Sequence, residues 1–277
     1  MIAQNWYRLF RSRSGTVGFT LVLLATLIGI LGPMLTGSPT HIGAEAFCPP
    51  SAACLLGTDD LGRDMFVRMA HGARVSLLVG FAAAAFASVI GIIVGAISGF
   101  VGGRIDELFM RVAEAFQVVP QFFLAILIVA LFGPSLTKIV LVIGILSWSD
   151  TARIVRAEFL KLRGQDFVVA ARLAGASRGA LIFSEILPNA LPPVIVTASL
   201  QIASAILTEA SLSFLGLGDP DQVSWGQLLF AAQPFLNQAW WMAVFPGLAI
   251  LVTTLGFNLL GDGLNDVLDP RQKGSAR

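Results

Sequence analysis

Long apolar stretches alternate with short polar segments along this chain, and the apolar stretches have about the length of membrane spans. A helix needs about 20 mostly apolar residues to cross a hydrocarbon core about 30 Å thick. The pattern predicts six spanning helices, at residues 16–35, 75–101, 115–132, 136–148, 191–215 and 241–260. The fourth stretch is short, so we expect its helix to continue past Asp150. The expected fold class is therefore an all-α integral membrane protein.

The composition agrees with this fold class. Hydrophobic residues make up 56% of the 277 residues, charged residues make up 13%, and the mean hydropathy is +0.80. A soluble domain carries about a quarter charged residues. The net charge is +1, and no basic face stands apart from the arginines that flank the spans. We therefore expect membrane lipid, and not nucleic acid, around this chain.

The basic residues predict the orientation of the spans. If the N-terminus is inside, the outer segments hold only Arg63, Arg68, Arg74 and Lys138, and the inner segments hold the other 14 of the 18 Lys and Arg residues. Cytoplasmic segments are enriched in Lys and Arg, so we expect a multi-pass protein with both termini in the cytoplasm. The first stretch is too long, and the Ala-x-Ala sequence at 44–46 too distant, for a cleaved signal peptide.

A polar interruption at residues 165–188 separates two of the apolar stretches. Six Lys and Arg residues lie between Arg153 and Arg178, which places this segment on the cytoplasmic side. Four residues are spaced to share one helical face, namely Phe167, Ala170, Ala171 and Ala174. Gly175 follows them and allows the backbone to turn. The pattern predicts a short helix whose small side chains let a soluble partner approach its backbone closely.

Small residues recur at every fourth position in the second stretch. They are Ala83, Ala87, Gly91, Gly95, Gly99 and Gly103. In lipid, such a stripe lets another helix approach closely, because association there depends on packing and not on hydrophobic exclusion. The stripe fits either packing within the chain or pairing with a second membrane subunit.

Cys48 and Cys54 lie in the first outer segment and enclose five residues. Disulfides persist on the oxidising side of a membrane, and closing so small a loop stabilises it by roughly 2 kcal/mol. Two free thiols are the alternative. A metal site is not expected, because no His or acidic cluster stands beside the cysteines at ligand spacing.

The residues needed for catalysis are scarce. His41 and His71 are the chain's two histidines, and no G-x-x-x-x-G-K-[ST] sequence is present to hold nucleotide phosphates. We therefore expect a non-catalytic chain that binds no cofactor or metal. Glu209 is the clearest ionisable residue at membrane depth, where a charge must face protein or water. It fits either a pathway or gate residue, or a structural hydrogen-bond anchor near the outer interface.

Residues 165–188 resemble the EAA loop of permease subunits in binding-protein-dependent ATP-binding cassette (ABC) importers. The loop typically has Glu-Ala-Ala, a Gly four residues after the second Ala, and Ile-Leu-Pro where the chain returns to the membrane. Here the matching positions hold Ala170, Ala171, Gly175, Ile186, Leu187 and Pro188. Val169 stands in place of the Glu, so a salt bridge from that position is not expected. Asp166 and Arg172 are the remaining candidates for polar contacts there.

Three longer blocks resemble the C-type permease of the dipeptide, oligopeptide and nickel branch of these importers. They include L-G-T-D-D-L-G-R-D-M-F, E-A-S-L-S-F-L-G-L-G and G-D-G-L-N-D-V-L-D-P-R. The resemblance implies a type I importer fold in the bacterial inner membrane, in which this chain forms half of the translocation pore. The implied partners are a B-type permease, two ABC ATPases that use ATP and Mg, and an extracytoplasmic substrate-binding protein.

The resemblance also implies a coupling role for the loop and a class of substrate. Residues 1–14 would be a cytoplasmic N-terminus, 15–74 the first span and outer loop, 75–265 the core permease domain with its coupling loop at 152–188, and 266–277 a cytoplasmic tail. Peptides are the first expected substrate and nickel or another small solute the second. An ion-gradient secondary transporter is the rival class, but several membrane-depth acids and inverted repeats would favour it, and neither is evident.

Overall fold

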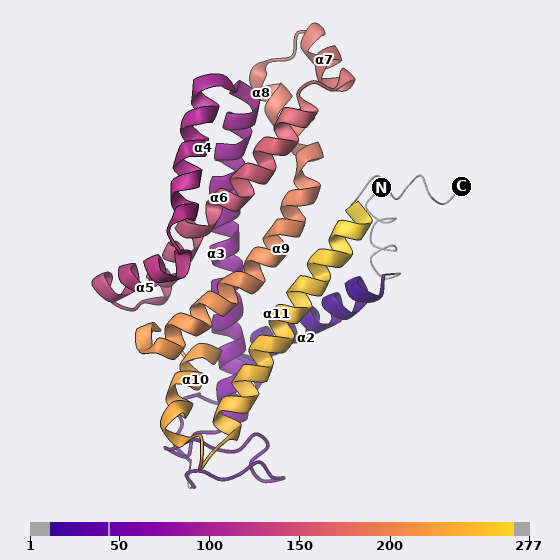
Figure 1. Ribbon diagram of the computed structural model, residues 1–277. Coiled ribbons are helices and arrows are strands. Elements are labelled where there is room, and N and C mark those ends of the chain that lie inside the picture. The colour runs from indigo at the N-terminus through magenta and orange to yellow at the C-terminus, as the bar shows by residue number, and fades with distance from the viewer. Residues whose placement is uncertain (1–11, 44, 269–277) are drawn as a thin grey trace.

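The computed structural model describes residues 12–43 and 45–268, and these residues form an elongated bundle of helices (Figure 1). The helices are α2 (Arg13–Leu35), α3 (Met65–Val101), α4 (Gly103–Val118), α5 (Gln121–Phe132), α6 (Leu136–Leu162), α7 (Asp166–Leu173), α8 (Arg178–Ala180), η1 (Leu181–Ile186), α9 (Leu187–Leu212), η2 (Ser213–Leu217), α10 (Trp225–Ala232), η3 (Gln233–Phe235) and α11 (Trp241–Leu268). The described residues contain no strand beyond one isolated bridge between Thr58 and Asp64. The expected all-α fold class is confirmed.

The bundle has two ends, which we name after the short helices that lie there. The α7 end carries α7 and α8, and the α10 end carries α10 and the loop at residues 36–64 (Figure 1). The chain passes between these ends along α2, α3, α4 with α5, α6, α9 and α11. Four helical stretches are long and apolar enough to cross a membrane, at Arg13–Leu35, Met65–Val101, Arg178–Leu217 and Trp241–Leu268. The bent pair of α4 and α5 makes a fifth if it is counted as one span, a number roughly consistent with the six expected. Helix α6, with 27 residues, also runs along the bundle.

The third predicted span, at residues 115–132, was wrong as a single helix. Its residues belong to α4 and α5, which are bent by 81° to each other. Pro120 has no N–H to donate and disfavours the helical conformation of the residue before it. Val119 accordingly takes an extended conformation, with φ −86° and ψ 127°, and α4 ends there.

Other spans are longer than the apolar pattern predicted. Helix α3 begins at Met65 and not at residue 75, because the Asp64 carboxylate accepts hydrogen bonds from the N–H groups of Phe66 and Val67 and caps the helix. The boundary expected between residues 74 and 75 therefore falls inside a helix. Helix α6 continues to Leu162, as expected from its short apolar stretch. Helix α11 continues to Leu268 and not to residue 260.

The fifth span is a 40-residue helical stretch, Arg178–Leu217, that begins before the predicted residue 191. It is widened to π-helix at η1, directly after the three residues of α8, and at η2, where it ends. Pro188 is the second residue after η1, and a proline ring collides with the carbonyl four residues earlier in a regular α-helix. The wider π-turn accommodates this ring while the helix continues into the membrane.

The small-residue stripe on α3 packs against α6. Ala83, Ala87, Gly91, Gly95 and Gly99 are all buried. A Cβ added to Gly95 would lie 2.4 Å from the carbonyl oxygen of Ala152 and 2.7 Å from the Cβ of Val155, so only glycine fits. Gly91 faces Thr151 and Gly99 faces Phe159, and this matched order means that α3 and α6 run parallel.

The stripe therefore serves packing within the chain at these five positions. Gly103 does not extend it, because α3 ends at Val101 and an added Cβ on Gly103 would meet nothing within 4 Å. The outermost segments of the domain scheme, residues 1–11 and 269–277, lie outside the described residues, while residues 12–14 and 266–268 lie at the start of α2 and in α11.

Replacing Gly95 by leucine will destabilise the bundle. The added side chain has no room against Ala152, and overpacking of this kind costs about 1–3 kcal/mol. We expect the thermal unfolding temperature of the purified protein in detergent to fall. Gly247→Leu is the matched control, because an added Cβ on Gly247 meets nothing within 4 Å. Equal unfolding temperatures for the two variants would contradict the α3–α6 packing.

Candidate docking and coupling site

Helix α7 is a short helix with a well-defined end. Its first turn carries Asp166 and its last turn carries Arg172, and both charges complement the helix dipole. The N–H of Gly175 donates to the carbonyl of Arg172 at 3.1 Å, and the N–H of Ala176 donates to the carbonyl of Ala171 at 3.1 Å. These two bonds form a Schellman motif. Gly175 has φ +85° and open space around it, so the motif needs glycine for its backbone conformation and not for lack of room.

One side of α7 is seated on the bundle. Val168 is fully buried, in a cluster with Val155, Phe159 and Ile186 from α6 and η1. Ala171 is half-buried on the same side. Of the four residues predicted to share one helical face, Phe167, Ala170 and Ala174 are exposed, and Ala171 lies at the edge of the buried side. Spacing alone could not assign Ala171, because it lies between the buried and exposed sides.

The other side of α7 is apolar and exposed. Leu173 is 85% exposed, and Phe167 and Val169 are exposed by 40% and 41%. Ala170 and Ala174 add small side chains to this surface. Figure 1 shows α7 at the extreme end of the bundle, beyond the long helices. Exposed apolar groups of this kind are typical of a surface that contacts another protein or the membrane.

The residues at the return to the membrane pack on the buried side of α7. Ile186 is fully buried in the cluster that contains Val168, and Leu187 packs against that cluster. Pro188 is exposed and lies in the first turn of α9. Ile186 and Leu187 therefore fix the position of α7, while Pro188 shapes the helix that follows.

The polar contacts expected of Asp166 and Arg172 stay a prediction. Neither makes an ion pair or hydrogen bond with another side chain in residues 12–43 and 45–268. Both are exposed, so any polar partner that they have must come from another molecule.

An ion pair that the sequence did not suggest braces the helices beneath α7. The Asp106 carboxylate of α4 accepts two bonds from the guanidinium of Arg156 in α6, at 2.5 and 2.8 Å. Ser98 of α3 also donates to Asp106, and Arg163 donates to the carbonyl of Gly99 at 3.1 Å. Bidentate arginine–carboxylate pairs fix geometry as well as charge. The pair joins α3, α4 and α6 at the α7 end, and no local sequence signal relates residues 50 positions apart.

Glu209 is buried near the α10 end. It is 2% exposed, and its Oε1 accepts hydrogen bonds from the hydroxyls of Ser213 and Ser224, each at 2.7 Å. The Ser224 hydroxyl also accepts the N–H of Gln227 and so caps α10. Among the described residues, Oε2 of Glu209 has no hydrogen-bond partner. The carboxylate thus joins the end of α9 to the start of α10.

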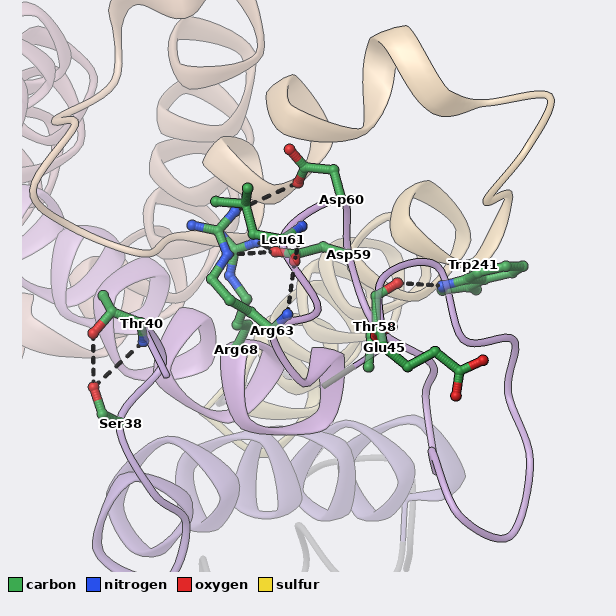
Figure 2. Close-up of polar contacts among 10 residues, drawn as sticks. All are labelled: Ser38, Thr40, Glu45, Thr58, Asp59, Asp60, Leu61, Arg63, Arg68 and Trp241. Carbon is green, nitrogen blue, oxygen red and sulfur yellow. Dashed lines mark hydrogen bonds and ion pairs between the residues drawn. The ribbon is translucent and has the colours of Figure 1, made fainter. Parts of the chain in front are cut away.

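A second buried carboxylate organises the outer loop (Figure 2). Asp59 is fully buried and accepts bonds from the N–H groups of Leu61 and Arg63 and from the Arg63 Nε at 2.7 Å. Arg68 of α3 pairs with the same carboxylate. The indole N–H of Trp241 donates to the carbonyl of Thr58 at 3.0 Å, which fastens the loop to α11. Residues 58–63 of the loop are therefore held against α3 and α11.

The same loop contains the two cysteines. Cys48 and Cys54 are joined by a disulfide, and the N–H of Cys48 donates to the hydroxyl of Thr58 at 2.8 Å. His71 contacts the carbonyl of Gly37, at 3.2 Å. In the part of the chain that the structure describes, no group of three His, Cys, Asp or Glu residues is placed to hold a metal ion.

Comparison with known proteins identifies the family. The family described as the inner membrane component of binding-protein-dependent transport systems matches residues 91–274. A putative peptide transport system permease protein of Brucella suis is 44% identical over 96% of this chain and 90% of its own length. The oligopeptide transport system permease protein OppC of Bacillus subtilis is 42% identical, over 95% and 87%. The di/tripeptide transport system permease protein DppC of Pseudomonas aeruginosa is 39% identical, over 99% and 94%. The chain, a multi-pass bundle with an apolar helix exposed at one end, therefore belongs to the family of binding-protein-dependent inner-membrane permease subunits.

Proposed function

We propose that this chain forms half of the translocation pore of an ATP-driven importer, and that α7 is the helix through which an ATPase drives it. The observation that carries this proposal is the division of α7 into two sides. Val168 is buried in the bundle while Leu173, on the other side, is 85% exposed. A helix fixed to the bundle on one side and bare on the other suits the transfer of movement between two proteins.

The α7 end is the cytoplasmic end in this proposal. Six passages along α2, α3, α4 with α5, α6, α9 and α11 bring the first and last helical ends to the same side of the membrane. Gly18 packs directly against the backbone of Leu260, so the start of α2 lies beside the last turns of α11. Both termini are then cytoplasmic, in agreement with the excess of Lys and Arg on this side.

In the proposed importer, separate subunits form the pore, hydrolyse ATP and deliver the substrate. A B-type permease completes the pore, two ABC ATPases bind at the α7 end and use ATP and Mg²⁺, and a substrate-binding protein docks at the α10 end. This chain is a non-catalytic subunit, since its sequence has no motif for nucleotide phosphates. In this proposal the pore has two states. ATP and the loaded binding protein bind at two distinct sites, and each biases the equilibrium because it contacts the two states differently.

Peptides are the proposed substrate. The relatives described above are named for peptide, oligopeptide and di/tripeptide transport. Nickel or another small solute is the second candidate.

Movement of α7 has a direct structural route into the membrane. Helix α6 leads into α7 through the short turn at residues 163–165, and η1 leads out of it into α9. The cluster of Val155, Phe159, Val168 and Ile186 keeps these elements together. At its far end, α9 reaches Glu209 and, through Ser224, helix α10. A displacement of α7 is therefore passed to α6 and α9 as a unit, and α9 carries it to the opposite end.

We propose that Glu209 anchors α10 to α9 and does not serve as a charged gate. One of its oxygens accepts both serine hydroxyls, and an amide oxygen can accept the same bonds.

Charging the exposed face of α7 will detach the ATPase. In Leu173→Asp the helix keeps its seat, because Leu173 does not contact the bundle core, but a carboxylate replaces the proposed apolar contact. We expect tagged wild-type chain, extracted in mild detergent, to bring with it a second permease and an ATPase. Leu173→Asp should bring the second permease with at least a roughly tenfold loss of ATPase, since apolar anchor residues at interfaces contribute about 2 kcal/mol or more.

Arg104→Gln is the matched control for this experiment. It changes the charge by the same amount at the same end, on an exposed residue of α4. It should retain the ATPase. Full ATPase recovery with Leu173→Asp would contradict the coupling role of α7, and recovery of intact wild-type chain alone would favour a secondary transporter.

Two substitutions at Glu209 separate the anchor from the gate. Glu209→Ala leaves the hydroxyls of Ser213 and Ser224 without their acceptor and should lower the free energy of unfolding by about 1–3 kcal/mol. Glu209→Gln keeps an acceptor oxygen, so stability and uptake should stay close to wild type. Loss of uptake by a stable Glu209→Gln protein would instead assign the carboxylate charge a role in transport.

A further inference from the structure

A basic cavity lies between the end of α3 and the turn that follows α7. It has a volume of about 480 Å³ and is lined by Phe100, Val101, Arg172, Ala176, Arg178 and Leu181. Two arginines therefore share one cavity with four apolar or small residues. The cavity lies on the side of α7 next to the bundle, since Ala176 packs against the same cluster as Val168.

The positive charge in this cavity has no internal counter-ion. Neither guanidinium, of Arg172 or Arg178, makes an ion pair or hydrogen bond within the described part of the chain. The carboxylate of Asp106, at the same end of the bundle, is paired with Arg156. Guanidinium groups bind phosphate oxygens with paired N–H donors, and two of them on one cavity select an anion of that kind.

The depth of the cavity indicates where the anion comes from. Phe100 and Val101 are the last two residues of the apolar span Met65–Val101, and Leu181 is the fourth residue of the span Arg178–Leu217. The apolar stretch of α3 therefore ends at the cavity, while Leu181 lies five residues before the return to the membrane at Ile186. The same two helical stretches carry exposed apolar side chains, including Ile97, Val101 and Phe183. These offer an acyl chain an apolar surface on the helices that line the cavity.

We propose that this cavity binds the phosphate of an anionic phospholipid, with Arg172 and Arg178 on the headgroup and the acyl chains along α3 and η1. Basic pockets between helices at the cytoplasmic surface are suited to such headgroups. Because Arg172 belongs to α7 and Arg178 to α8, the bound lipid links both to the end of α3. The lipid then holds α7 in place from its bundle side, while the exposed face of Leu173 stays free.

This inference rests on the proposed function only in that it places the α7 end at the cytoplasmic leaflet. The affinity of the lipid and the docking of the ATPase are separate measurements on separate residues. If the proposed lipid site is wrong, the proposed ATPase docking on α7 is unaffected, and the reverse also holds.

The test measures lipid binding to the intact permease complex. The complex is purified, stripped of lipid, and titrated with phosphatidylglycerol or phosphatidylcholine while bound lipids are counted by native mass spectrometry. Arg172→Gln/Arg178→Gln is compared with Arg104→Gln/Arg111→Gln, which removes the same charge from exposed residues of α4 that do not line the cavity. We expect about a tenfold or greater loss of affinity for phosphatidylglycerol in the first variant and no change in the second.

The other arms identify the ligand. Phosphatidylcholine should bind weakly to all three proteins, and excess inorganic phosphate should not displace phosphatidylglycerol. Displacement of phosphatidylglycerol by phosphate would mean that the cavity binds a small free anion and not a lipid, and it would overturn the proposal. Unchanged phosphatidylglycerol binding by Arg172→Gln/Arg178→Gln would also overturn it, and unchanged lipid with lost ATPase would assign both arginines to the ATPase contact.

Discussion

The backbone of α3 lies directly against α6 because glycine or alanine occupies every fourth position along their contact. Lipid surrounds these helices, so the apolar side chains gain little from meeting one another, and close van der Waals packing must hold the pair. At Gly95 the neighbouring carbonyl of Ala152 leaves no room for even one methyl group. This parallel pair places the end of α6 beside the end of α3, and α7 is built on that end.

The other contacts at the α7 end depend on this packing of α3 against α6. The Asp106–Arg156 pair ties α4 to the same end of α6, and Phe159 and Val155 form the seat into which Val168 of α7 inserts. The Schellman motif at Gly175 then reverses the chain into α8. The result is a short helix held on one side and bare on the other, which is the geometry needed to receive force from a soluble partner. The buried carboxylates of Asp59 and Glu209 do comparable work at the α10 end, since each joins a short outer segment to a long helix.

The sequence predicted the features that depend on local pattern. Apolar length located the long helices, and the stripe on α3 was visible from its spacing. Its partner was not, because spacing identifies a close-packing face without saying which helix meets it. The break at Pro120 was missed because the apolar pattern continues across it while the backbone does not. The burial of Ala171 was not predictable for a related reason, because periodicity groups residues on a face but the bundle decides which face it covers.

Tertiary contacts account for the rest. Asp106 and Arg156 are 50 residues apart, and Trp241 meets Thr58 across most of the chain, so neither contact leaves a local signal. The resemblance to importer permeases was the sequence observation that reached furthest, and the family match confirms it. It marked Gly175 and Ile186 as special, and the structure gives the reasons, a left-handed turn at one and full burial at the other.

The most direct test of the account is chemical cross-linking from the bare face of α7. The chain's two cysteines are paired with each other, so Leu173→Cys introduces a single free thiol. Treated with a thiol-to-amine cross-linker in native membranes, this variant should form a product that contains the chain and an ATPase, and its yield should change when ATP is trapped. Arg104→Cys, at the same end but away from α7, should form little of it. Cross-linking to an ATPase from Arg104→Cys and none from Leu173→Cys would contradict the claim that α7 is the coupling helix.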